Sequence, residues 1–92
     1  MRTLEFPPAM EHRVLQVMTG KRQTASEIEF NLGVLGIEPR DINQMLANLR
    51  RRGCVDRTEY RPGRYKWFQT EYGSLLAQFI NYHGESSDNT PG

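Results

Sequence analysis

The sequence is poor in the residues that enzymes and metal proteins use. Its one cysteine, Cys54, cannot form an internal disulfide, and we expect it to be a small buried residue at the start of a strand. His12 and His83 have no neighbours at metal-ligand spacing, and we expect His12 to be exposed between Glu11 and Arg13. Neither a glycine-rich phosphate loop nor a Ser–His–Asp pattern appears. We therefore expect no enzyme activity, no metal and no cofactor.

Long apolar runs are missing as well. No segment approaches the roughly 18–20 apolar residues that a membrane-spanning helix needs. The first residues also lack the apolar core of a signal peptide, so we expect a cytoplasmic protein. With 92 residues, 37% of them hydrophobic, the chain suits one domain with a single modest core.

The net charge of +1 conceals an uneven distribution. Residues 40–66 hold eight basic and three acidic side chains, a net charge of +5, whereas the rest of the chain holds four basic and eight acidic ones, a net charge of −4. Such polarity gives one surface a positive field while the molecule stays near neutral. A single charge usually means only a solvated surface, but eight basic residues within one helix and one hairpin favour a binding surface.

Apolar periodicity and capping signals predict four helices and one β-hairpin. The helices are expected at about 8–19, 24–32, 39–52 and 71–83, and the strands at 55–60 and 65–69. Thr24 and Glu27 have the spacing of a capping box, and Pro62-Gly63 has the order of a type II turn. The buried stripe of the first helix is expected to be Met10, Val14, Val17 and Met18. Residues 1–7 then form an extended lead, residues 8–83 the domain, and residues 84–92 a disordered tail.

The helix at 39–52 carries a different chemistry on each face. One face is an apolar stripe at i, i+3, i+4 and i+7, formed by Ile42, Met45, Leu46 and Leu49. The other face carries Arg40, Asn43, Gln44, Ala47, Asn48 and Arg51. Arg, Asn and Gln side chains can make bidentate contacts with guanine and adenine edges. The candidates for reading base edges in DNA are therefore Arg40, Asn43, Gln44 and Asn48, with Arg51 reaching a base or a phosphate. The alternative is that the three amides are simply solvated.

Two further groups of residues suit the DNA backbone. Thr24 and Ser26, together with the amides of their helix start, can hold a phosphate. The hairpin adds three basic candidates, which are Arg61, Arg64 and Lys66. The aromatic residues Tyr65, Trp67 and Phe68 are expected to pack the hairpin on the core, the alternative being that one of them stacks on a base of a single-stranded ligand.

Residues 24–73 resemble the winged helix-turn-helix domain of the MarR and PadR families. The matching segments are Thr24-Ala25-Ser26-Glu27-Ile28, Leu32-Gly33-Val34, residues 42–49, Arg50-Arg51-Arg52-Gly53-Cys54-Val55-Asp56-Arg57, Pro62-Gly63-Arg64-Tyr65 and Thr70-Glu71-Tyr72-Gly73. The resemblance implies an α+β winged helix-turn-helix, with a three-helix core, a two-stranded β-hairpin wing (55–69) and a C-terminal helix. It also implies that the helix at 39–52 enters the major groove of double-stranded DNA, with the wing touching backbone or minor groove. The chain departs from the family in a longer turn at Leu35-Gly36-Ile37, in acidic Glu38 and Asp41, and in polar Gln69.

The function we expect is that of a sequence-specific DNA-binding transcriptional regulator, acting as a repressor. Members of these families often bind as two-fold dimers, and the last helix is more apolar than one small core requires. The residues expected at such a homodimer interface are Leu75, Leu76, Phe79, Ile80 and Tyr82. The alternative function is a winged-helix module that uses the same basic surface to bind an acidic protein partner.

Overall fold

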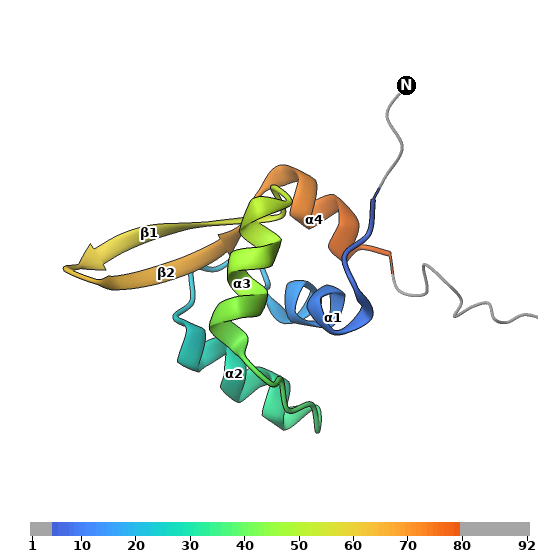
Figure 1. Cartoon of the computed structure of the whole chain (residues 1–92), viewed down its shortest axis with the longest axis horizontal. Helices are drawn as coiled ribbons and strands as arrows, with labels where there is room; N and C mark the ends of the chain where they lie inside the picture. Colours follow the sequence, from blue (N-terminus) through green and yellow to red (C-terminus); the bar gives the residue numbers. More distant parts are fainter. Residues whose placement is uncertain (1–4, 80–92) are drawn as a thin grey trace, which may run out of the picture.

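The computed structural model describes residues 5–79 and contains four helices and one β-hairpin (Figure 1). The elements in chain order are α1 (Ala9–Val17), α2 (Ala25–Val34), α3 (Ile42–Arg51), β1 (Val55–Arg61), β2 (Arg64–Gln69) and α4 (Glu71–Ala77). The predicted order of elements is confirmed. The prediction of a disordered tail at 84–92 falls outside the described residues. No helix within the described part of the chain is long and apolar enough to cross a membrane.

Helix α1 is the centre of the core and packs against α2, α3 and α4. Its predicted stripe was partly wrong: Val14 and Met18 are fully buried, but Met10 is 38% exposed and Leu15 is buried in its place. The expectation of an exposed His12 was also wrong, because the side chain is 1% exposed. Its Nε2 lies 2.9 Å from the Leu76 carbonyl oxygen. Neighbours on several sides bury a wider face of α1 than a single helical stripe provides.

Helix α2 begins at the predicted capping box. The Thr24 hydroxyl accepts a hydrogen bond from the Glu27 backbone N–H, and the Glu27 carboxylate accepts one from the Thr24 N–H. The helix continues to Val34, two residues beyond the predicted end, so that Gly33 is helical. Gly36 then adopts a φ of 77°, which a glycine allows, and Ile37 packs against the core.

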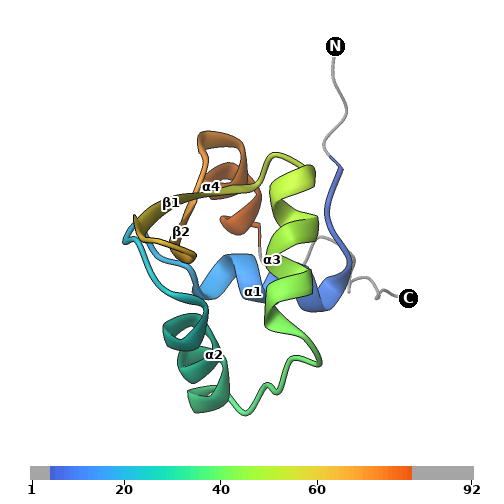
Figure 2. The ribbon, with the colours of Figure 1, turned by 60° about the vertical axis from the view of Figure 1, so that its left-hand side comes forward.

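Helix α3 lies across the front of α1 (Figures 1 and 2). Residues 52–54, which include Gly53, connect it to the hairpin. The helix begins later than predicted, because Asp41 is its N-cap and accepts a hydrogen bond from the Gln44 backbone N–H. Pro39 and Arg40 therefore precede the helix. Its predicted apolar stripe is confirmed, with Ile42, Leu46 and Leu49 buried and Met45 half-buried against the core.

The hairpin projects away from the helices and is anchored at its base (Figure 1). Its strands pair antiparallel with Arg57 opposite Trp67, and the turn contains Gly63 at a φ of 74°. Trp67 is 5% exposed and exchanges two backbone hydrogen bonds with Gln23, which precedes α2. The expectation that Trp67 packs the hairpin on the core is confirmed.

Helix α4 closes the core over the base of the hairpin. The Thr70 hydroxyl caps it by accepting a hydrogen bond from the Gly73 backbone N–H, and Leu76 is fully buried. Gln69, which departs from the family pattern, has a hydrogen-bond partner in the core. Its Nε2 donates to the Leu15 carbonyl oxygen at 2.8 Å. The helix ends at Ala77, before the predicted end, and residues 80–83 of the prediction lie outside the described part.

Candidate nucleic-acid interface

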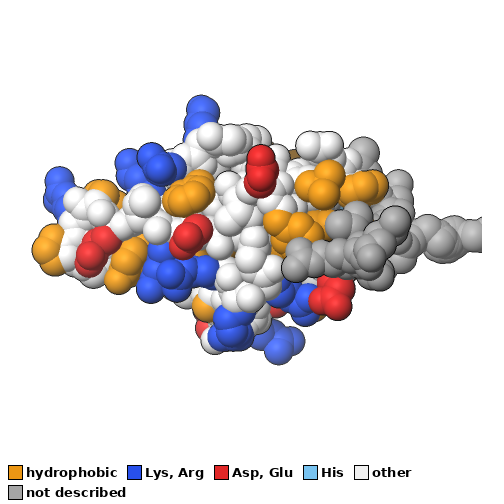
Figure 3. Space-filling model, turned by 90° about the horizontal axis from the view of Figure 1, so that it is seen from above, with side chains coloured by type: hydrophobic (Ala, Val, Ile, Leu, Met, Phe, Trp, Pro, Cys, Tyr) orange, Lys and Arg blue, Asp and Glu red, His pale blue; other side chains and the backbone are white. Residues whose placement is uncertain are grey.

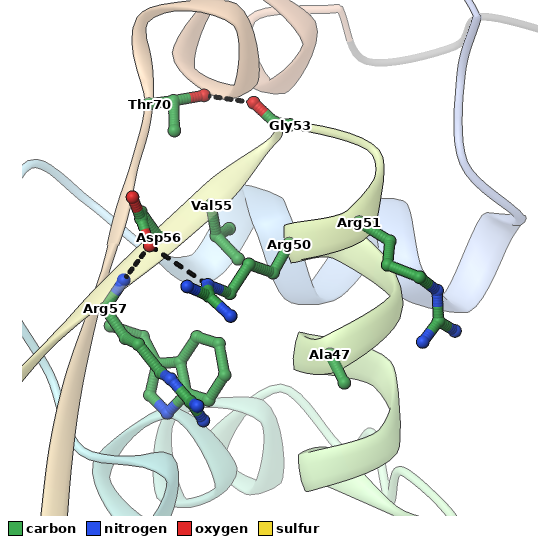
Figure 4. A pocket seen from close by; sticks show the side chains of 9 residues that line it. Ala47, Arg50, Arg51, Gly53, Val55, Asp56, Arg57 and Thr70 are labelled. Carbon is green, nitrogen blue, oxygen red and sulfur yellow. Dashed lines mark hydrogen bonds and ion pairs between the residues drawn. The ribbon is translucent and has the colours of Figure 1, made fainter.

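Helix α3 and strand β1 enclose a cavity of about 450 Å³ that is rich in arginine (Figure 4). Arg50 points from α3 toward β1, where its Nε donates to Asp56 Oδ1 at 3.0 Å. The backbone N–H of Arg57 donates to the same oxygen at 2.8 Å. These two hydrogen bonds, the one from the Arg57 N–H first, lower the pKa of the Asp56 carboxyl group below its ordinary value. Asp56 therefore holds Arg50 against the wing.

A second cavity, of about 620 Å³, lies between the start of α2, the start of α3 and the wing. It brings together four of the residues proposed from the sequence, which are Thr24, Ser26, Asn43 and Arg64. Residues from three separate parts of the fold thus line one hollow. The capping box also uses the Thr24 N–H and hydroxyl, which leaves Ser26 as the exposed hydroxyl of this group.

Arg57 lines both cavities and was not among the residues selected from the sequence. Its guanidinium carbon lies 3.9 Å from the ring centroid of Tyr65 and 5.3 Å from that of Trp67. Stacking on two rings fixes a guanidinium while leaving its N–H groups available. The alternation of the hairpin contained the signal, because Arg57 is the cross-strand partner of Trp67.

The residues proposed on α3 differ in exposure and in their side-chain hydrogen bonds. Asn43 and Gln44 are exposed. Asn48 is half-buried, and its Nδ2 donates to Glu11 Oε2 of α1 at 3.0 Å. Its Oδ1 accepts from Gln44 Nε2 at 3.1 Å and from Arg51 Nη2. Asn48 is therefore not the solvated residue that one alternative foresaw, but a link between α1 and the outer face of α3.

The other basic candidates, Arg40, Arg61 and Lys66, do not line either of these two cavities. Arg40 is exposed in the loop before α3, and Arg61 and Arg64 are exposed at the hairpin turn. Lys66 is half-buried, with its Nζ 5.2 Å from the ring centroid of Tyr60. Figure 3 shows Lys and Arg side chains gathered over the wing half of one face, with a few acidic side chains among them.

The residues proposed for a dimer interface do not form one exposed surface. Leu76 is fully buried in the core of its own chain, so its assignment to an interface was wrong. Leu75 and Phe79 are each 42% exposed, and hydrophobic side chains gather at the α4 end of the face in Figure 3. Ile80 and Tyr82 lie outside the described residues.

No metal or nucleophile site emerges from this part of the chain. Within residues 5–79, no group of three or more His, Cys, Asp or Glu side chains is placed to hold a metal ion. Cys54 is fully buried, as expected, and its burial raises the pKa of the thiol above the ordinary value. A protonated, inaccessible thiol is a poor nucleophile.

The arrangement of α2, α3 and the hairpin decides the architecture. The chain has the winged helix-turn-helix fold. In this winged helix, α2 and α3 form the helix-turn-helix and β1 and β2 form the wing. No protein-family model matches the sequence, and no curated protein matches it.

Several solved structures share the winged-helix fold. Lactococcus lactis ZitR, a zinc-responsive MarR family member, superposes with a TM-score of 0.63 at 15% identity, over 83% of this chain and 52% of ZitR. The structure of wild-type ZitR in complex with DNA also gives a TM-score of 0.63 at 15% identity, over 83% of this chain and 51% of ZitR. A PadR-like transcription factor from Bacteroides fragilis gives 0.61 at 18% identity, over 76% of this chain and 75% of that protein. The winged helix thus spans about half the length of the ZitR chains.

Proposed function

We propose that this winged helix is a sequence-specific, double-stranded DNA-binding transcriptional regulator that acts as a repressor. One observation carries the proposal. Ser26, Asn43, Arg57 and Arg64 come from the start of α2, the start of α3 and both strands of the wing, and they line one hollow. Hydroxyl, amide and guanidinium groups on one concave surface match the donors that DNA-binding proteins present to phosphates and base edges. The fold that the chain shares with ZitR, one structure of which is in complex with DNA, supports the same proposal.

In this proposal α3 enters the major groove and the wing follows the adjacent backbone or minor groove. Asn43 and Gln44 contact base edges, and Arg51 contacts a base or a phosphate. The arginines of the wing, with Lys66, contact phosphates, and Arg57 joins them at the angle between α3 and the wing. Arg40 contacts DNA from the loop before α3. A regulator of this size represses by occupying promoter DNA.

The proposal is tested by selecting bound duplexes from a random DNA pool and measuring affinity at several salt concentrations. We expect one enriched site and an affinity that falls steeply with salt, because bound arginines release counterions from the phosphates. Arg64→Ala removes one such contact, so the slope of log affinity against log salt should decrease by about 1.

Arg13→Ala is the matched control. It removes the same charge from an exposed position on α1, which does not line either cavity, and it should leave the slope unchanged. Absence of an enriched site, or binding insensitive to salt, would contradict the proposal. The basic surface would then be examined for docking of an acidic protein partner.

A further inference from the structure

A buried carboxylate lies directly behind the DNA-facing surface of α3. Glu11 is on α1, which packs against α3, and it is only 9% exposed. Its Oε2 accepts the hydrogen bond from Asn48 Nδ2 at 3.0 Å, whereas its Oε1 is buried without a hydrogen-bond partner among the described residues. A carboxyl group with one hydrogen bond is costly to bury at a helix–helix contact, where an apolar residue of similar size is often at least as stabilising. The position of Glu11 therefore calls for an explanation other than stability.

The hydrogen bond to Glu11 determines which way the Asn48 amide faces. The Asn48 Nδ2 donates to Glu11 Oε2, so the NH₂ group points inward to α1 and the carbonyl oxygen points outward. The outward oxygen then accepts from Gln44 and Arg51, which stand one helical turn to either side. With both lone pairs of its oxygen in use, Asn48 is unsuited to the paired donor and acceptor contact that an amide makes with adenine. Asn48 instead holds the side chains of Gln44 and Arg51 in place.

These hydrogen bonds with Asn48 keep the longer side chains of Gln44 and Arg51 in defined positions. Gln44 donates one N–H to Asn48 and keeps its carbonyl oxygen and a second N–H, the pair that adenine recognition uses. Arg51 leaves α3 on the side away from the wing and keeps further N–H groups (Figure 4). Long side chains that are already fixed lose less conformational freedom on binding, and they are held away from positions that suit other bases.

We propose that Glu11, from behind α3, sets the DNA sequence preference of the protein by orienting Asn48 and, through it, Gln44 and Arg51. This inference rests on the proposed DNA-binding function. Glu11 is a positioning residue and touches no DNA. Its removal should therefore change which sequences are preferred while leaving the electrostatic affinity for any sequence intact.

The test compares Glu11→Leu with Glu11→Gln by duplex selection and by the ratio of specific to non-specific affinity. Both variants lose the same charge, but only the glutamine keeps an oxygen that accepts from Asn48. We expect Glu11→Gln to select the wild-type site. We expect Glu11→Leu to lose its preference at the base pairs read by Gln44 and Arg51, with the affinity ratio reduced roughly tenfold or more. Its non-specific affinity and salt slope should equal those of Glu11→Gln, which has lost the same charge.

Asn48→Ala provides a second, independent variant. Because Glu11 acts only through Asn48, this substitution should cause the same loss of preference, and adding Glu11→Leu to it should cause no further loss. A folded Glu11→Leu variant that selects the wild-type site with an unchanged ratio would overturn the inference, as would equal losses in the leucine and glutamine variants. If Glu11→Leu does not fold, an unchanged preference in Asn48→Ala overturns it. If the wild type selects no site, both this inference and the proposed function fail.

Discussion

At the scale of single residues, position 73 requires a glycine because there is no room for a side chain. Gly73 is helical, so its conformation would suit any residue, but it lies against the backbone of Cys54. A Cβ atom at this position would overlap the Cys54 carbonyl oxygen, the same oxygen that accepts a hydrogen bond from the Thr70 backbone N–H at 3.0 Å. The glycine lets α4 sit directly on the junction between α3 and the wing, and thereby fixes the wing relative to α3.

Gly73→Ala should lower the free energy of unfolding by about 1–3 kcal/mol, since neither backbone can move without disturbing the helix cap or the base of the hairpin. Gly33→Ala is the matched control. Gly33 is also helical, but nothing lies within 4 Å of an added Cβ, so alanine should raise the free energy of unfolding by about 0.5–1 kcal/mol. Urea denaturation measures both. Equal effects of the two substitutions would contradict the steric explanation.

Individual polar residues were the hardest to predict from the sequence. The apolar stripe of α3 was predictable because one face of that helix meets the core. In α1 the same reasoning missed Glu11 and His12, whose partners, Asn48 and Leu76, lie 37 and 64 residues away along the chain. Local periodicity carries no information on contacts this distant. Arg57 differs from the other basic residues only through the pairing of the strands, which places it opposite Trp67.

At the scale of elements, the start of α3 combines a helix cap with a negative charge that would oppose the proposed contact with DNA. Asp41 caps the helix by accepting from the Gln44 N–H at 3.1 Å. The predicted start at Pro39 was wrong because the capping side chain, rather than the proline, fixes the first turn. The same carboxylate stands beside Asn43 and repels phosphate.

Asp41→Ala and Asp41→Asn separate these two effects. Alanine removes the cap and should lower the free energy of unfolding by about 1 kcal/mol, whereas asparagine keeps a capping oxygen and should stay close to the wild type. Both remove the negative charge, so both should raise the affinity for DNA under low-salt conditions. Chemical denaturation and DNA titration of the two variants give the answer. An asparagine variant as unstable as the alanine variant would show that the negative charge, acting on the helix dipole, is what stabilises the start of α3.

At the scale of the whole molecule, two exposed apolar regions are candidates for the interface between two copies of the protein. One is at α4, where Leu75 and Phe79 are each 42% exposed. The other is at the end of α2, where Phe30, Val34 and Leu35 are 71%, 70% and 60% exposed. The sequence pointed to α4 because of its apolar content. In the turn after α2, Ile37 packs against the core, whereas Leu35 is exposed.

We predict that the protein is a two-fold dimer through α4, and that Leu75→Ser converts it to a monomer in sedimentation experiments. The same substitution at α2, Leu35→Ser, is the matched control and should leave the dimer intact. A dimer through α4 has a further consequence for DNA, because the duplexes selected by the wild type should contain an inverted repeat and those selected by Leu75→Ser a single half-site. If only Leu35→Ser dissociates the dimer, the interface lies at α2 and not at α4. The half-sites in the selected DNA should then have a different spacing. A wild type that sediments as a monomer and selects an unrepeated site would instead mean that one winged helix recognises its DNA alone.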